Sequence, residues 1–286
     1  MKALVTGAGG QLGRALLASA PKGWTVTGLT RADLDIGDVA AVDEAVERAA
    51  PEVIVNAAAH TAVDRAESEP DLAFQINREG AANLARAGRR AGARLVHVST
   101  DFVFDGHASR PYKPDDPTGP VNVYGASKLA GELAVAQAAP EALIVRTAWV
   151  YGPTGANFLA TMLRLMASRP ELGVVADQIG TPTSTLTLSP ALWTLAASEA
   201  RGVLHFTDAG VASRYDFAQA IAEEALAAGV LERAPPVKPI STADYPTPAA
   251  RPAFSVLDKS ATFDLLGGPA AHWRAALRAV LGGIKP

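Results

Sequence analysis

The chain has 286 residues, of which 49% are hydrophobic and none is cysteine. Its formal net charge of −3 gives no electrostatic reason to expect nucleic acid or an acidic membrane surface as a partner. The missing cysteines exclude disulfides, thiolate metal ligands and a cysteine nucleophile, and they fit a reducing compartment.

The N-terminus, MKALVTGAGG, starts directly with a strand pattern and lacks the long apolar segment and cleavage site of a signal peptide. No apolar run reaches the roughly 18 residues that a membrane helix needs. We therefore expect a cytoplasmic protein with no membrane partner.

In the first half of the chain, short β-branched runs alternate with alanine-rich helical stretches. This pattern predicts βαβ units and an α/β fold, a Rossmann-type doubly wound parallel sheet. The expected strands are 3–6, 25–29, 53–56, 95–99 and 143–147, and the expected helices are 11–18, 39–49, 71–91 and 123–138.

After about Val150, proline and glycine become frequent and the expected strands become short. We expect helices at 158–167 and 216–228 there. We divide the chain into an NAD(P)-binding Rossmann domain, 1–150, and a smaller C-terminal α/β lobe, 151–286. The lobe would mainly bind substrate, and some of its segments could return to the first domain.

A glycine-rich stretch, VTGAGGQLG, joins the first strand to the first helix. Gly7, Gly10 and Gly13 are spaced G-x-x-G-x-x-G, a variant of the dinucleotide fingerprint. Glycine lets the backbone approach a pyrophosphate closely, and the helix N-terminus offers unpaired N–H groups to the phosphates. The alternative is an ordinary strand–helix turn, but the strand–loop–helix context favours a cofactor site.

The end of the second strand bears on the choice of nicotinamide cofactor. No acidic residue directly follows Leu29, and Arg31 lies two residues further on. An arginine there accommodates the extra phosphate of NADPH, whereas NADH readers use a carboxylate. The sequence leans slightly toward NADPH, although Arg31 is also compatible with a solvated surface charge. Asp35 and Ile36 suit an adenine contact.

Tyr124 and Lys128, in NVYGASKLAGE, are one helical turn apart and therefore share a helix face. Ketone reduction needs a proton on oxygen, and a phenol with an ordinary pKa of about 10 donates it reluctantly at neutral pH. A nearby ammonium would lower that pKa, and the hydroxyl of Thr100 or Ser99 would hold the carbonyl oxygen. The amine would also hydrogen-bond the nicotinamide ribose. The alternative is a surface pair on an amphipathic helix.

Three segments would lie at the carboxyl ends of neighbouring strands, where ligands bind in an open α/β sheet. They are NAAAHTAVD, VSTDFVFDG and RTAWVYG. Together with the glycine loop, NVYGASKLAGE, DQIGTPT and DYPTPAARPAFSVLD, they resemble the extended short-chain dehydrogenase/reductases. Within these, the chain is similar to the dTDP-4-dehydrorhamnose reductase family over nearly its whole length.

The resemblance implies NADPH- or NADH-dependent reduction of a dTDP-linked 4-keto-6-deoxy sugar. The 4-keto group of dTDP-4-dehydro-β-L-rhamnose would be reduced to give dTDP-L-rhamnose. Matched motif by motif, it implies a catalytic set, a cofactor set and a sugar pocket. The catalytic set is Thr100, Tyr124 and Lys128. The cofactor set is Gly7, Gly10, Gln11, Leu12, Gly13, Arg31, Asp35, Ile36, Ala57, Ala58 and His60, together with Tyr124 and Lys128. The sugar pocket is Thr61, Val63, Thr100, Phe102, Tyr124 and Trp149. Read alone, His60 and Trp149 are equally compatible with packing roles.

The chain departs from the family pattern at two places. Phe102 stands where the family commonly has a tyrosine, so any hydroxyl contact there is lost while ring packing is kept. Some relatives carry a glutamate shortly after the glycine loop that helps bind magnesium between subunits; here the position is Ala15. We therefore expect no metal, and no metal-bridged dimer, while a homodimer through other surfaces remains open.

Two other functions fit the same fold. The regulatory β subunit of methionine adenosyltransferase resembles this family and acts as a binding partner, but a scaffold has no need of an intact Thr100, Tyr124 and Lys128. Nucleotide-sugar epimerases and dehydratases generally need further acid–base groups near the tyrosine. Asp101 is followed by Phe102 with no glutamate beside them, which disfavours dehydration without excluding it.

Overall fold

The computed structural model describes residues 1–284, and its centre is a six-stranded sheet in the order β10-β5-β4-β3-β1-β2. Every neighbouring pair is parallel, which confirms the predicted α/β fold. The strand order reverses between β1 and β3, and this switch point opens a crevice at the carboxyl ends of the strands. The strands are β1 (Lys2–Thr6), β2 (Thr25–Leu29), β3 (Val53–Asn56), β4 (Arg94–Thr100), β5 (Leu143–Thr147) and β10 (Gly202–His205).

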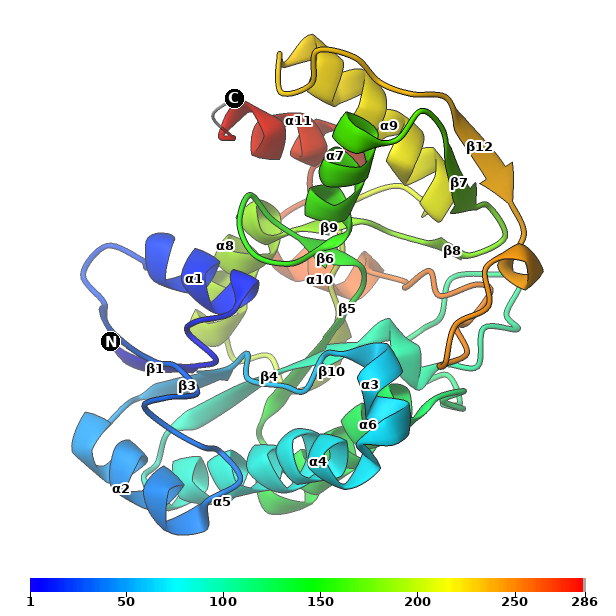
Figure 1. Ribbon diagram of the computed structural model, residues 1–286. Coiled ribbons are helices and arrows are strands. Elements are labelled where there is room, and N and C mark those ends of the chain that lie inside the picture. The colour runs from blue at the N-terminus through cyan, green and yellow to red at the C-terminus, as the bar shows by residue number, and fades with distance from the viewer. Residues whose placement is uncertain (285–286) are drawn as a thin grey trace.

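Helices cover both faces of this sheet (Figure 1). Every residue of β3 and β5 is buried, as expected for strands enclosed on two sides. One face carries α2 (Val39–Ala49), α5 (Ala81–Arg90) and α6 (Val123–Ala138); the other carries α1 (Gln11–Ala18), α8 (Thr185–Ala197) and α10 (Ser260–Leu265). In residues 1–284 no helix is both long and apolar enough to cross a membrane.

The single helix expected at 71–91 is divided in the structure. After α3 (Val63–Ser68), α4 (Pro70–Phe74) leads into a π-helical segment, η1 (Gln75–Gly80), before α5 begins. Helix α6 lies so close that a Cβ added to Gly131 would stand 2.1 Å from the Asn77 carbonyl oxygen. The wider π turn accommodates this contact and directs the Asn77 side chain to the backbone of His60.

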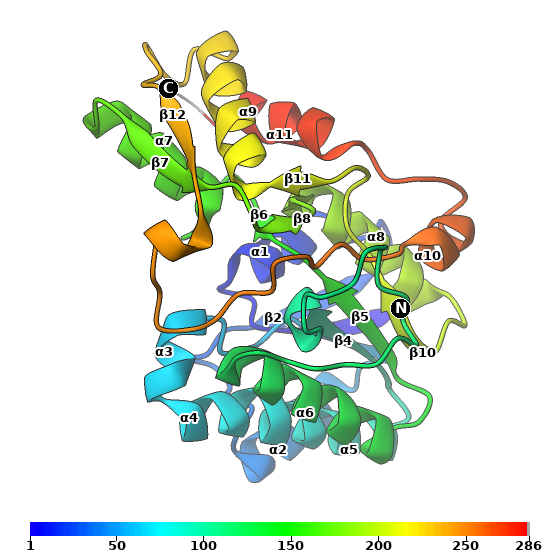
Figure 2. The same ribbon diagram turned by 90° about the vertical axis from the view of Figure 1, so that its right-hand side faces the viewer.

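Apart from α8, β10 and α10, the elements from Val150 onward form three two-stranded sheets and several helices. We call this the peripheral group: β6 (Val150–Tyr151), β7 (Leu172–Val175), β8 (Ile179–Gly180), β9 (Thr183–Ser184), β11 (Ala212–Ser213), β12 (Val237–Ile240), α7 (Phe158–Ser168), α9 (Arg214–Ala227) and α11 (Trp273–Gly282). In Figure 2 most of this group lies above the main sheet, with β6 and β8 nearest to it. Helices α7 and α9 match the two predicted helices to within two residues. Positions 285–286 of the predicted lobe lie outside the described residues.

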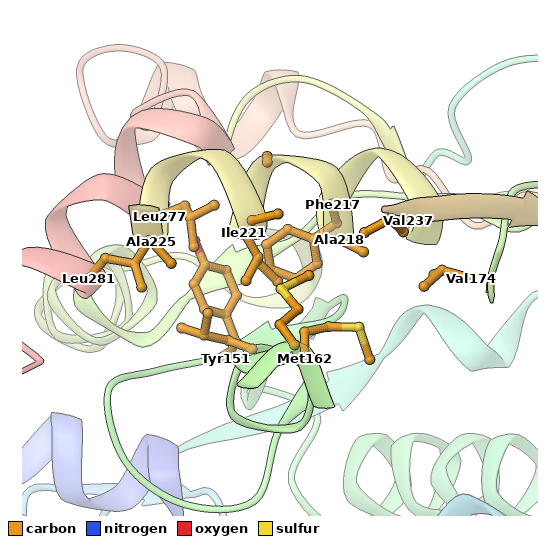
Figure 3. Close-up of a cluster of buried hydrophobic side chains, with 14 of the residues drawn as sticks. Tyr151, Met162, Val174, Phe217, Ala218, Ile221, Ala225, Val237, Leu277 and Leu281 are labelled. Carbon is orange, nitrogen blue, oxygen red and sulfur yellow. The ribbon is translucent and has the colours of Figure 1, made fainter. Parts of the chain in front are cut away.

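The peripheral group has its own hydrophobic core (Figure 3). Tyr151 and Phe217 have no exposed surface, and their ring centroids are 5.1 Å apart. Not all of the chain after Val150 belongs to this core. Strand β10 pairs with β5, and Trp193 of α8 donates its indole N–H to the Leu16 carbonyl of α1 at 3.1 Å.

A buried ion pair joins the main sheet to helix α6. The Arg146 guanidinium on β5 lies 2.7 Å from the Glu132 carboxylate, and both side chains are about 5% exposed or less. Ser99 of β4 donates its hydroxyl hydrogen to the same carboxylate. The charges are therefore compensated inside the protein and not by water.

We expect Glu132→Gln to lower the free energy of unfolding by about 3 kcal/mol, because it leaves the Arg146 charge buried without a counterion. Urea denaturation would measure the change. The matched control is Glu44→Gln, since Glu44 pairs with Arg48 at 73% and 72% exposure and should contribute less than about 0.5 kcal/mol. Equal effects of the two substitutions would contradict the assignment.

Candidate active site

A cavity of about 730 Å³ opens along the carboxyl edge of the main sheet, and it brings all the predicted site residues together. The glycine loop lies on one side of the switch point, and the start of α6 and the segment after β5 lie on the other. The predicted residues in its wall are Gly7, Gly10, Gln11, Leu12, Gly13, Arg31, Asp35, Ile36, Ala57, Ala58, His60, Thr61, Val63, Thr100, Phe102, Tyr124, Lys128 and Trp149.

The glycine loop folds tightly against the end of β3. Gly7 has φ +72°, and a Cβ there would lie 2.6 Å from the Ala58 backbone nitrogen. A Cβ on Gly13 would lie 2.2 Å from the Gly7 carbonyl oxygen. Gly10 is the N-cap residue of α1 and supplies no side-chain cap, so the first N–H groups of the helix are available to an anion.

The Gln11 side chain has a role that its sequence position did not indicate. Its amide nitrogen donates to the Val150 carbonyl at 3.0 Å, and its amide oxygen accepts from Asn157 at 3.3 Å. The side chain thus joins the glycine loop to the segment after β5. Any contact of Gln11 with a pyrophosphate would therefore be made by its backbone N–H.

At the far end of the cavity, Asp35 and Ile36 are held in fixed positions. The Asp35 carboxylate accepts the Gly37 N–H at 2.9 Å, and Ile36 is 4% exposed with its side chain directly against Gly80. Arg31 is exposed at the rim, and within residues 1–284 it forms no ion pair. Its charge is therefore available to a ligand phosphate.

His60 and Thr147 contribute unsatisfied polar atoms to the cavity wall. The His60 backbone is fixed by two hydrogen bonds to the Asn77 carboxamide, at 2.8 and 3.1 Å. His60 Nδ1 and Thr147 Oγ1 are buried and have no partner in the described part of the chain. Buried polar groups are normally satisfied, so these atoms, the uncapped α1 terminus and the close-packed glycines fit a polar dinucleotide.

Tyr124 lies in the first turn of α6, which begins where the Asn122 side chain caps the Gly125 N–H at 2.7 Å. Tyr124 is only 9% exposed, and this burial raises the pKa of its phenol to about 12, while the Thr100 hydroxyl opposes the rise. The expected lowering of the pKa by Lys128 is not seen. The Lys128 amine turns toward β4 and donates to the Val98 carbonyl at 2.7 Å.

Thr100 and Phe102 fix the surroundings of the phenol. The Thr100 hydroxyl donates to the Asp101 carboxylate at 3.1 Å and accepts the Phe102 N–H at 3.2 Å. The Phe102 ring meets the Tyr124 ring edge-on, with centroids 5.6 Å apart, and Val63 packs against the same cluster. Ring packing at position 102 is thus present without a hydroxyl.

Trp149 has an unusual backbone conformation and a clamped ring. Its φ of +46° is in the left-handed region, which a bulky residue rarely adopts. The Arg214 guanidinium lies 3.5 Å from the ring centroid on one side, and a Cβ on Gly180 would stand 2.6 Å from ring atom Cε2. Arg214 also lines the cavity. No sequence motif marks Arg214, the first residue of α9, as a site residue.

Asp101 directly follows Thr100, and its carboxylate is fully engaged by its neighbours. Its carboxylate accepts hydrogen bonds from Ser255 and Thr100, and burial raises its pKa to about 6. Among residues 1–284 there is no group of three or more His, Asp or Glu side chains placed to hold a metal ion.

A parallel sheet with a glycine loop at its switch point, and a Y-x-x-x-K helix facing that loop across one cavity, defines a short-chain dehydrogenase/reductase. The chain belongs to the family described as the RmlD substrate binding domain, whose model matches residues 1–285. The family predicted from the sequence motifs is thereby confirmed.

The chain is similar to known proteins over almost its full length. It is 47% identical to a dTDP-4-dehydrorhamnose reductase from Mycobacterium tuberculosis, covering 97% of this chain and 91% of that protein. Two solved dTDP-4-dehydrorhamnose reductases each match over 98% of both chains. The one from Clostridium acetobutylicum has a TM-score of 0.91 at 41% identity. The one from Bacillus anthracis, in complex with NADP, has a TM-score of 0.92 at 37% identity.

We expect Gly180→Ala to displace the Trp149 ring, because the added methyl group would overlap it. Overpacking of this kind costs about 1–3 kcal/mol in unfolding free energy. Near-UV circular dichroism should change along with stability. Gly282→Ala is the control, since nothing lies within 4 Å of a Cβ there. An unchanged tryptophan spectrum in Gly180→Ala would contradict the proposed clamp.

Proposed function

We propose that this protein reduces the 4-keto group of a dTDP-linked 4-keto-6-deoxy sugar, using NADPH or NADH. The substrate is dTDP-4-dehydro-β-L-rhamnose and the product is dTDP-L-rhamnose. The observation that carries the proposal is the convergence of Thr100, Tyr124 and Lys128 with the glycine loop on one cavity. It occurs in a chain whose relatives at 44–47% identity are dTDP-4-dehydrorhamnose reductases.

Each group in this set has a distinct chemical task. The bound cofactor would supply hydride to the ketone carbon. Tyr124 would give its phenolic proton to the ketone oxygen, and its raised pKa means that the phenol is protonated at neutral pH, as a donor must be. Thr100 would hold the ketone oxygen, and the Lys128 amine would bind the nicotinamide ribose and compensate the charge left on the phenol.

The sugar and its nucleotide would occupy the part of the cavity between Val63, Phe102 and Trp149. These three residues precede Val150, but Arg214 of α9 lies over the Trp149 ring and also lines the cavity. Substrate binding would therefore depend on the main sheet and on the segment that follows it. We propose the division at residues 150 and 151 with α8 and β10 assigned to the first domain, because both pack on the main sheet.

The two alternative functions receive less support from the site. A dehydratase needs a free acid or base next to the tyrosine, but the Asp101 carboxylate is occupied by Ser255 and Thr100. A purely regulatory subunit has no use for a buried phenol, amine and hydroxyl on one cavity wall. Reduction uses all three groups.

Tyr124→Phe tests the proposal directly. Purified protein is mixed with dTDP-4-dehydro-L-rhamnose and NADPH or NADH, the loss of cofactor absorbance is followed, and the sugar product is identified. Removing a general acid typically costs about 10²–10⁴-fold in rate, so we expect kcat to fall by that factor while the Kd for cofactor stays nearly constant. Tyr245→Phe, at a residue 61% exposed, is the control. Undiminished turnover by Tyr124→Phe would remove the phenol from this role.

Arg31→Ala tests the cofactor preference. A charge-assisted hydrogen bond to phosphate contributes about 1.5–3 kcal/mol, so the Kd for NADPH should rise about 10–100-fold. NADH lacks that phosphate, and its Kd should change little. Titration of the intrinsic fluorescence of each reduced cofactor gives both constants. An equal effect on the two would show that Arg31 does not read the extra phosphate.

A further inference from the structure

A chain of buried polar groups runs behind the cavity from β1 to Lys128. Thr6 of β1 donates its hydroxyl to Asn56 Oδ1 at 2.7 Å, and Asn56 Nδ2 lies 3.0 Å from His97 Nδ1 on β4. His97 Nε2 then lies 3.5 Å from Lys128 Nζ. Asn56 and His97 are each 1% exposed and Lys128 is 2% exposed, so water does not mediate these contacts.

The hydrogen bonds determine which His97 nitrogen carries the proton. Asn56 Oδ1 accepts from two groups, the Thr6 hydroxyl and the Ala58 N–H at 3.0 Å, and the backbone N–H can only donate. The orientation of the carboxamide is therefore fixed, and its Nδ2–H must donate to His97 Nδ1. A neutral ring that accepts at Nδ1 carries its hydrogen at Nε2. Burial and Lys128 both keep the pKa of His97 well below its usual range, so the ring is neutral.

The Nε2–H of His97 consequently points at the Lys128 amine. If Lys128 is an ammonium, its N–H groups and the His97 Nε2–H are both donors and oppose each other. If Lys128 is a neutral amine, its lone pair can accept the His97 Nε2–H. The contact therefore favours the uncharged amine. We propose that His97, locked in one tautomer by Asn56, is a positioning residue that makes the Lys128 ammonium release its proton more readily. This inference rests on the function proposed above for Lys128.

The other groups around Lys128 act in known directions. Glu132, on the same helix, favours the ammonium, although its carboxylate is shared with Arg146 and Ser99. The Val98 carbonyl also accepts from the amine. Tyr124 is the remaining titratable neighbour on α6, and Asp101 of η2 (Asp101–Val103) acts on Tyr124. Burial is the largest influence and lowers the pKa of Lys128 to about 8. His97 adds to burial and opposes Glu132.

A readily released proton is useful in this reaction. Once Tyr124 has given its proton to the sugar oxygen, the phenolate needs another. The Lys128 ammonium would supply it and become the neutral amine that the His97 Nε2–H stabilises, with the imidazole keeping its own proton throughout. His97 cannot act as a relay, because its Nδ1 accepts from the Asn56 carboxamide, whose N–H is not acidic enough to transfer a proton.

Two substitutions separate the functions of the two ring nitrogens. In His97→Asn the new amide oxygen can take the place of Nδ1 and keep the bond to Asn56, while nothing replaces Nε2–H. In His97→Gln the new amide nitrogen can take the place of Nε2 and keep a donor facing Lys128. The first variant should raise the pKa of Lys128 by about one unit, since one donor opposing the cation is removed, and the second should leave it nearly unchanged.

The Lys128 pKa is measured in cofactor-free protein by NMR titration of ¹³C-labelled lysine, with Lys128→Met used to assign the signal. This readout does not depend on turnover, so failure of the inference and failure of the proposed reductase activity are distinguishable. In the activity assay, the alkaline limb of the pH profile should move about one unit higher in His97→Asn and stay in place in His97→Gln.

The tautomer is measured independently in the wild-type protein. A ¹⁵N-histidine spectrum should show His97 protonated at Nε2 and unprotonated at Nδ1. A proton on Nδ1 would overturn the proposal even if neither variant folded. An unchanged or lowered Lys128 pKa in His97→Asn would overturn it as well.

Discussion

The carboxamide of Asn56 holds the catalytic edge of the sheet in one geometry. It is hydrogen-bonded to Thr6 on β1, to the Ala58 backbone after β3 and to His97 on β4. Strands β1 and β3 flank the switch point, with β4 next to β3. The glycine loop follows β1, and Lys128 of α6 donates to Val98 on β4. Removing the carboxamide would leave several buried groups unpaired, each at a cost of about 1–3 kcal/mol. The cavity therefore depends on a side chain that does not line it.

Local signals were sufficient to predict much of the fold. The expected strands at 25–29, 53–56 and 143–147 and the expected helices at 11–18, 39–49 and 123–138 have the observed bounds. Side chains such as Asp38 and Asn122 cap the helices that follow them, and β3 and β5 begin with continuous apolar runs and are buried along their whole length. The site residues were recognisable for a related reason: in a parallel sheet all strands end at one edge, so motifs far apart in sequence meet there.

What the sequence did not reveal depends on tertiary contacts. The π-helical turn at η1 lies where the α6 backbone approaches Asn77 at Gly131, a contact that no local pattern encodes. Helix α8 was not predicted, and it contains Pro190, which argues against a helix in any local reading. Arg214 and the Asn56–His97 pair gain their significance only from the partners they meet across the fold.

The position of β10 has a consequence for how the protein can be divided. The chain leaves the main sheet after β5, builds α7 and several short strands, and returns with α8 and β10 before leaving again. A fragment that ended at Val150 would bare the edge of β5 and the apolar surface that α8 covers on α1. The unpaired edge of β5 could form backbone hydrogen bonds with other copies of the fragment. We therefore expect such a fragment to aggregate and not to remain an independent nucleotide-binding domain.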